Sequence, residues 1–150
     1  MSQHLSKQKS ETLFNKFMDW RDKLLGIKQA VIIVEGKRDI EVLYKLGVTN
    51  NTNIIIGYSQ KSAVEVDDFL ANPMYKDYVI VPLVDFDRQG EEYLTELQSM
   101  SAKIDLELRR ELRNLTRGKL VEFEDLFYLM ENRLHSNYWI ILCQRLNIFG

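Results

Sequence analysis

A short apolar run that ends in two acidic residues constrains the fold of this chain more than any other feature. Residues 79–90 read VIVPLVDFDRQG, so the run leads to Asp85 and Asp87 just before Gly90. An earlier run, VIIV, ends in Glu35 and a glycine. Short runs of this kind are typical of buried parallel strands. Because parallel strands end at the same edge of a sheet, the two runs predict that these acidic side chains meet there.

The rest of the chain alternates between strand and helix patterns. We predict strands at 31–34, 54–56, 78–84 and 103–106, and helices at 11–25, 38–46, 60–70, 90–100, 107–115 and 121–134. Apolar residues three and four apart indicate the helices, and short β-branched runs indicate the strands. Pro82 cannot donate a ladder hydrogen bond, so its strand is predicted to be an edge strand or irregular there. Strands that alternate with helices predict an α/β fold with a central, mainly parallel, four-stranded sheet.

Composition favours one compact domain. The chain has 150 residues, of which 45% are hydrophobic, enough for a core of its own. We expect a frayed start at residues 1–10, an amphipathic helix packed on the domain within 1–28, and the main domain at 29–134. Residues 135–150 are apolar and would complete the core, or contact a second copy or a protein partner.

The same composition predicts a cytoplasmic protein that does not enter a membrane. The single cysteine, Cys143, excludes an intrachain disulfide, as suits a reducing compartment. The first ten residues, MSQHLSKQKS, contain no apolar signal core. The longest apolar runs are far too short to cross a bilayer.

The spacing of the two aspartates suits a shared divalent cation. In an extended chain Asp85 and Asp87 point to the same side, and Phe86 points to the other. Mg²⁺ takes hard oxygen ligands, commonly one or two carboxylates plus substrate phosphates. Gly90 lets the backbone turn away into a helix without a side chain that would block the ligand site, and Arg88 has a planar fork that can bind a phosphate. We therefore predict a Mg²⁺ site, with Mn²⁺ as a substitute ion.

The end of the first strand extends this site. Glu35 could bind the cation, or could act as the general acid or base at the transferred oxygen. Neighbouring acids would raise its pKa, which favours the second role. Gly36 permits a tight turn and the close approach of a ligand. Lys37 is predicted to contact a phosphate, and Asp39 to orient Lys37 or to cap the next helix.

Charge is unevenly distributed along the chain. The net charge is only −2, but residues 63–96 carry −7 and residues 101–119 carry +3. Exposed helix faces are the plain interpretation of both. The alternative is a basic wall beside an acidic metal site, which would bind nucleic acid. Under that alternative, Arg109, Arg110 and Arg113 hold phosphates of the substrate.

Each half of the acidic pattern is a weak signal by itself. D-x-D pairs often lie in turns or bind calcium adventitiously, and Glu-Gly is less specific still. The two together, each after an apolar strand, are a much stronger signal. The chain has no Walker loop, no G-x-S-x-G and no G-x-G-x-x-G motif. Haloacid-dehalogenase-like phosphatases carry their D-x-D after the first strand, whereas here it follows the third predicted strand.

The stretches VIIVEGKRD and LVDFDRQGEE together resemble a Toprim domain. This module is shared by type IA and type II topoisomerases, bacterial-type primases, OLD-family nucleases and ribonuclease M5. Its marks are Glu-Gly after the first strand and Asp-x-Asp after the third. The resemblance is closest to small stand-alone Toprim proteins and covers about residues 29–134. It implies a Rossmann-like three-layer fold, with Glu35 as the catalytic-type glutamate and Asp85 and Asp87 as the magnesium pair.

The resemblance leaves two functions open. A topoisomerase needs a nucleophilic tyrosine on another domain, and a primase needs template- and zinc-binding parts, so neither activity is expected of these residues alone. The leading hypothesis is a Mg²⁺-dependent nuclease or nucleotidyl-transfer-type enzyme acting on RNA or DNA, with Glu35, Lys37 and Arg88 in the chemistry. The alternative is a non-enzymatic module that binds nucleic acid or a nucleotide within a larger complex.

Overall fold

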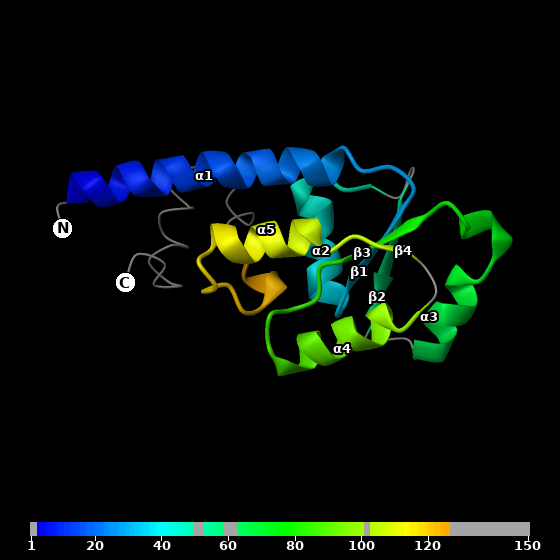
Figure 1. Cartoon of the computed structure of the whole chain (residues 1–150). Coiled ribbons are helices and arrows are strands. Elements are labelled where there is room, and N and C mark those ends of the chain that lie inside the picture. The colour runs from blue at the N-terminus through cyan, green and yellow to red at the C-terminus, as the bar shows by residue number, and fades with distance from the viewer. Residues whose placement is uncertain (1–2, 50–52, 59–62, 101–102, 127–150) are drawn as a thin grey trace.

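The computed structural model describes residues 3–49, 53–58, 63–100 and 103–126 (Figure 1). The strands are β1 (Ala30–Val34), β2 (Ile54–Gly57), β3 (Val79–Pro82) and β4 (Lys103–Ile104). The helices are α1 (Gln3–Leu25), α2 (Lys37–Leu46), α3 (Ala63–Leu70), α4 (Arg88–Gln98) and α5 (Glu107–Leu115), with 3₁₀ helices η2 (Pro73–Tyr75) and η3 (Phe123–Leu126). The strands form one sheet in the order β2-β1-β3-β4, and every pair is parallel.

Alternate residues of β1 face opposite sides of the sheet. Ala30, Ile32 and Val34 belong to one core cluster, together with buried residues of α1, α2 and α5. Val31 and Ile33 belong to a second cluster, with buried residues of α3 and α4. The helices therefore cover both faces of the sheet, as Figure 1 shows. This confirms the predicted α/β fold with a central four-stranded sheet, in the three-layer arrangement of Rossmann-like proteins.

Helix α1 is longer than its apolar pattern predicts. It begins at Gln3, so the expected frayed start at residues 1–10 is wrong for residues 3–10. Among residues 11–25 of α1, Phe17, Trp20 and Leu24 are buried in the core. The indole N–H of Trp20 donates to the carbonyl of Leu108 on α5 (2.8 Å). These contacts dock α1 beside α5 on one face of the sheet.

Pro82 has a different place from the one predicted. β3 lies inside the sheet, between β1 and β4, so the prediction of an edge strand is wrong. The N–H of Leu83 donates to Ile33 on β1 (2.7 Å), and the nitrogen one residue earlier therefore faces the β4 side. β4 is only two residues long and pairs with Val79 and Ile80. No strand among residues 3–49, 53–58, 63–100 and 103–126 lies where a donor from Pro82 would be needed, so the proline is tolerated.

The C-terminal predictions are only partly covered by the structure. The helix predicted at 121–134 is wrong at its start, where residues 121 and 122 are not helical and η3 follows. The remainder of that helix and the apolar segment at 135–150 lie outside the described residues. Within the described part, no helix is both long enough and apolar enough to cross a bilayer.

Candidate metal centre

Three carboxylates meet at the edge of the sheet where the strands end. Glu35 directly follows β1, and Asp85 and Asp87 lie on the loop between β3 and α4, which we call the acidic loop (residues 83–87). β1 and β3 are hydrogen-bonded neighbours, so their ends are adjacent. All three side chains are half-buried, and each offers an oxygen that lies within 4.8 Å of the others. The structure thus brings together the three residues that the sequence predicts as metal ligands.

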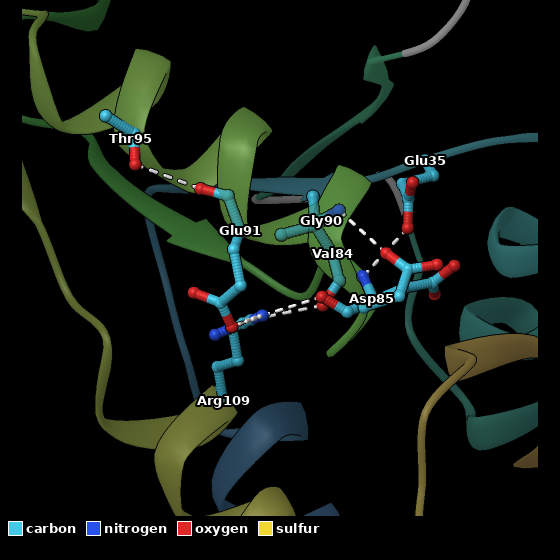
Figure 2. A network of polar contacts seen from close by, with 8 residues as sticks. Glu35, Val84, Asp85, Gly90, Glu91, Thr95 and Arg109 are labelled. Atoms are coloured by element: carbon cyan, nitrogen blue, oxygen red, sulfur yellow. Dashed lines mark hydrogen bonds and ion pairs between the residues drawn. The ribbon is translucent and has the colours of Figure 1, made fainter.

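Each of these carboxylates is oriented by a backbone N–H group. Glu35 accepts from the N–H of Asp85 (2.9 Å), as Figure 2 shows. Asp85 accepts from the N–H of Phe123 (2.8 Å) through Oδ1, and Asp87 accepts from the N–H of Gly90 (2.8 Å) through Oδ1. Asp87 is also the N-cap of α4. These bonds fix the directions of the three side chains before any ligand arrives.

Phe123 is a part of the site that the sequence analysis missed. Its segment returns to the acidic loop after α5, where the N–H of Phe86 also donates to Val121 (2.7 Å). The Phe123 ring is buried in the core, which holds its backbone in place. A backbone donor does not depend on the type of side chain, so no motif could have revealed it.

The carboxyl group of Glu35 holds its proton more strongly than a free glutamate does. Burial raises the pKa of Glu35 to about 8, supported by a side-chain hydrogen bond with Asp85 and by the negative charges of Asp85 and Asp87. A divalent cation would remove this repulsion. Three hard oxygen donors within 4.8 Å fit Mg²⁺ or Mn²⁺ after a small side-chain movement, because these ions sit about 2.1 Å from their ligands. The residues present therefore fit such an ion.

Asp39 takes one of the two roles predicted for it. It accepts a hydrogen bond from the N–H of Gly36 (3.0 Å), which caps the first turn of α2. Burial raises the pKa of Asp39 to about 6, and the charges of Asp85 and Glu124 add to the effect. Oδ1 of Asp39 is buried and has no hydrogen-bond partner among the described residues. The structure thus gives Asp39 a capping role close to the acidic cluster.

Lys37 and Arg88 are the first residues of two helices that begin at this edge. Lys37 opens α2 and Arg88 opens α4, and both are exposed. Arg88 makes an exposed ion pair with Glu92 (3.5 Å) and does not approach the carboxylates through any described contact. Both cations are therefore available to an anion that approaches the site, with two helix N-termini of partial positive charge beside them.

Gly90 is needed for a reason other than the one predicted. Its Cα faces the backbone of the acidic loop, so an added Cβ would lie 2.0 Å from the carbonyl oxygen of Asp85. The first turn of α4 therefore packs directly against the residue that carries a predicted metal ligand. Glycine is required here because the backbone of Asp85 is so close, and the predicted reason, that a side chain would block the ligand site, is not the one that the structure shows.

The three predicted phosphate-binding arginines fall into two groups. Arg109 is only 6% exposed and its guanidinium is bonded inside the protein, so a direct contact with phosphate is wrong for it. Arg110 and Arg113 are exposed on α5. They line a cleft of about 130 Å³ whose other walls include Phe86, the residue between the two aspartates. The basic wall therefore adjoins the acidic loop through Arg110 and Arg113.

Proteins of one family match this chain over most of its length. A UPF0292 protein of Pyrococcus furiosus is 35% identical over 129 residues, which are 84% of this chain and 92% of the relative. The chain belongs to the UPF0292 family. UPF0292 proteins of Methanocaldococcus jannaschii and Methanosarcina barkeri are 32% and 33% identical, over 81% and 73% of this chain and 94% and 76% of their own length. No family model and no solved structure matches the chain.

For this UPF0292 protein without metal, we expect the melting temperature to fall as the pH rises from about 5 to 8. Folded Glu35 keeps its proton up to a pKa of about 8, whereas the free carboxyl ionises near 4.5, so folding is favoured by the proton and weakened as pH rises through this window. Asp39, with its pKa raised to about 6, acts in the same direction. Thermal unfolding in EDTA measures the effect. Glu35→Gln cannot ionise and should show a smaller fall, and an equal fall in both proteins would contradict the assignment.

Proposed function

We propose that this UPF0292 protein is a cytoplasmic, Mg²⁺-dependent Toprim protein that acts on nucleic-acid phosphodiesters, as a nuclease or a nucleotidyl-transfer-type enzyme. The observation that carries the proposal is the set of three carboxylates, Glu35, Asp85 and Asp87, with oxygens within 4.8 Å of one another at the carboxyl edge of a parallel sheet. Ligands of open α/β sheets bind at that edge. The order of these acids, Glu-Gly after β1 and Asp-x-Asp after β3, is the order that the Toprim resemblance requires.

Different residues of the site would have different roles in phosphoryl transfer. A bound Mg²⁺ would neutralise charge on the phosphoryl group and orient its oxygens. In hydrolysis, a water oxygen bonds to phosphorus while the bond to the leaving ester oxygen breaks. Glu35 would take the proton of the attacking water or give one to the leaving oxygen. Lys37 and Arg88 would hold non-bridging oxygens as the helix N-termini face the anion.

The basic residues beside the acidic loop support a polymeric substrate. A single phosphate could be held by the metal with Lys37 and Arg88. Arg110 and Arg113 lie three residues apart on α5, on the same side of the helix, and line the cleft against Phe86. Arginine forks bind phosphates in a bidentate manner, so this cleft, on the Phe86 side of the acidic loop, would take another phosphate of a nucleic-acid chain.

The experiment that tests this function is a cleavage assay on several substrates. End-labelled structured RNA, single-stranded DNA and supercoiled plasmid are incubated with the protein and Mg²⁺ or Mn²⁺. Glu35→Gln is assayed in parallel, because glutamine keeps an acceptor for the N–H of Asp85 but cannot move a proton. Glu41→Gln, at an exposed position of α2, is the matched control. We expect cleavage of one substrate class by wild type and the control, and none by Glu35→Gln.

Two other outcomes would change the assignment. Metal-dependent retention of a substrate with no cleavage would favour a binding module that works within a larger complex. Cleavage that survives Glu35→Gln unchanged would show that another site, or a contaminant, is its source.

A further inference from the structure

Arg109 makes an unusual set of contacts for a residue of an amphipathic helix. Its Nε donates to the carbonyl of Val84 (3.1 Å) and its Nη2 donates to the carbonyl of Asp85 (2.6 Å). Nη2 also pairs with Glu91 on α4 (2.9 Å), so one guanidinium joins α5, α4 and the acidic loop (Figure 2). The guanidinium carbon lies 4.6 Å from the centre of the Phe86 ring. Three successive residues of the acidic loop are therefore held by one side chain.

Asp85 is consequently fixed at three atoms by three different elements. Its N–H donates to Glu35 after β1, its Oδ1 accepts from the N–H of Phe123, and its carbonyl accepts from Arg109. Figure 2 shows Arg109 and Glu35 on opposite sides of the loop backbone. The first two contacts join groups that lie at the carboxylate cluster. Arg109 binds the loop from the opposite side, at the carbonyl group of Asp85, and so helps to fix the backbone from which the Asp85 side chain extends.

We propose that Arg109 is a positioning residue that holds the acidic loop in the geometry required to bind a divalent cation. This inference rests on the proposed metal centre. Arg109 does not contact the substrate in this role, because it is 6% exposed and acts through the backbone of Val84 and Asp85. Among the described residues the loop has no strand partner on this side, since β4 ends at Ile104 and pairs only with the start of β3. The guanidinium satisfies carbonyls that the short β4 does not reach.

An arginine suits this place better than a lysine. Nε and Nη2 are adjacent donors in a rigid plane, so they can bind two successive carbonyls at the same time. The flat guanidinium also lies against Phe86, whereas an ammonium group has no such face. Glu91 balances the buried positive charge, and its side chain remains 47% exposed. A lysine would keep the charge but lose the fork and the stacking.

The decisive measurement is the affinity for Mn²⁺, by isothermal titration, of wild type and Arg109→Lys. We expect Arg109→Lys to fold and to bind Mn²⁺ about 10- to 100-fold more weakly, the usual effect of removing a group that orients metal ligands. In the cleavage assay its kcat should fall with little change in KM. A phosphate-binding arginine would instead raise KM and change the salt dependence. Glu91→Gln is a second variant that should fold, because the Glu91 side chain is about half exposed, and it should show a smaller loss of Mn²⁺ affinity.

A matched control separates positioning from general stability. Leu115→Ala removes a buried side chain from the end of the same helix and none of the hydrogen bonds that hold the acidic loop, so it should lower the melting temperature but leave the Mn²⁺ affinity unchanged. Equal Mn²⁺ affinity in wild type and Arg109→Lys would overturn this inference and leave the metal centre intact. An equal loss of affinity in Leu115→Ala and Arg109→Lys would also overturn it. Absence of Mn²⁺ binding by wild type would refute the metal centre itself, and this inference with it.

Discussion

Asp85→Asn should abolish metal-dependent cleavage while leaving the protein folded. Asparagine keeps an oxygen that can accept from the N–H of Phe123, but it removes the negative charge that a cation needs. We expect Mg²⁺ affinity to become unmeasurable and cleavage to fall by about 1,000-fold or more, which corresponds to roughly 4 kcal/mol of transition-state stabilisation. Isothermal titration with Mg²⁺ and the cleavage assay measure the two effects. Without metal, the melting temperature of Asp85→Asn should equal or exceed that of wild type, because one source of repulsion is gone.

Asp85→Ala distinguishes the two roles of this side chain. It removes the charge and also leaves the N–H of Phe123 without its acceptor, at a cost of about 1–3 kcal/mol in the free energy of unfolding. We expect both variants to lose metal binding and only Asp85→Ala to lose stability. Asp77→Asn, at an exposed position between η2 and β3, is the control and should behave as wild type. Wild-type Mg²⁺ affinity in Asp85→Asn would show that the three carboxylates are not the metal centre.

The sequence was sufficient to predict the meeting of Glu35, Asp85 and Asp87 because each step is local. A buried strand is visible as a short apolar run, and parallel strands end at one edge whatever their order in the sheet. The position of β3 within the sheet could not be predicted from its own residues. A proline excludes a neighbouring strand only on the side that its nitrogen faces, and β4 ends before it reaches Pro82. The rule therefore holds at the residue, although β3 as a whole lies inside the sheet.

Arg109 shows a second limit of sequence reasoning. On α5 the leucines at 108, 112 and 115 mark the buried side, and the basic residues between them are expected to be exposed. Arg109 is buried because it binds the carbonyls of Val84 and Asp85. These partners lie more than twenty residues earlier in the chain, so no local pattern relates them to Arg109. Carbonyl acceptors occur in every residue, so the sequence contains no sign of them. Arg110 and Arg113, which make no comparable contacts, are exposed as the charge pattern predicts.

Gly90→Ala should destabilise the protein although alanine is the better helix former. Within a helix, alanine is favoured over glycine by about 1 kcal/mol. Here the new Cβ would lie 2.0 Å from the carbonyl oxygen of Asp85 and 2.6 Å from its carbonyl carbon, and neither backbone atom can rotate away as a side chain would. We expect a loss of about 3 kcal/mol in the free energy of unfolding, or roughly 6–12 °C in Tm for a chain of this size. Thermal and urea unfolding measure it.

The same substitution should also weaken metal binding, because relief of the contact must separate α4 from the acidic loop. Asp87 lies between them and would lose the N–H of Gly90 that orients it, so we expect Mg²⁺ affinity to fall by about 10-fold or more. Gly26→Ala is the matched control: its Cβ would lie 3.4 Å from the nearest carbonyl oxygen, an ordinary contact, and both measurements should stay near wild type. A Gly90→Ala protein with wild-type stability and Mg²⁺ affinity would mean that the acidic loop moves freely. In that case the bound ion would bring the carboxylates together, and metal affinity would not depend on their arrangement before binding.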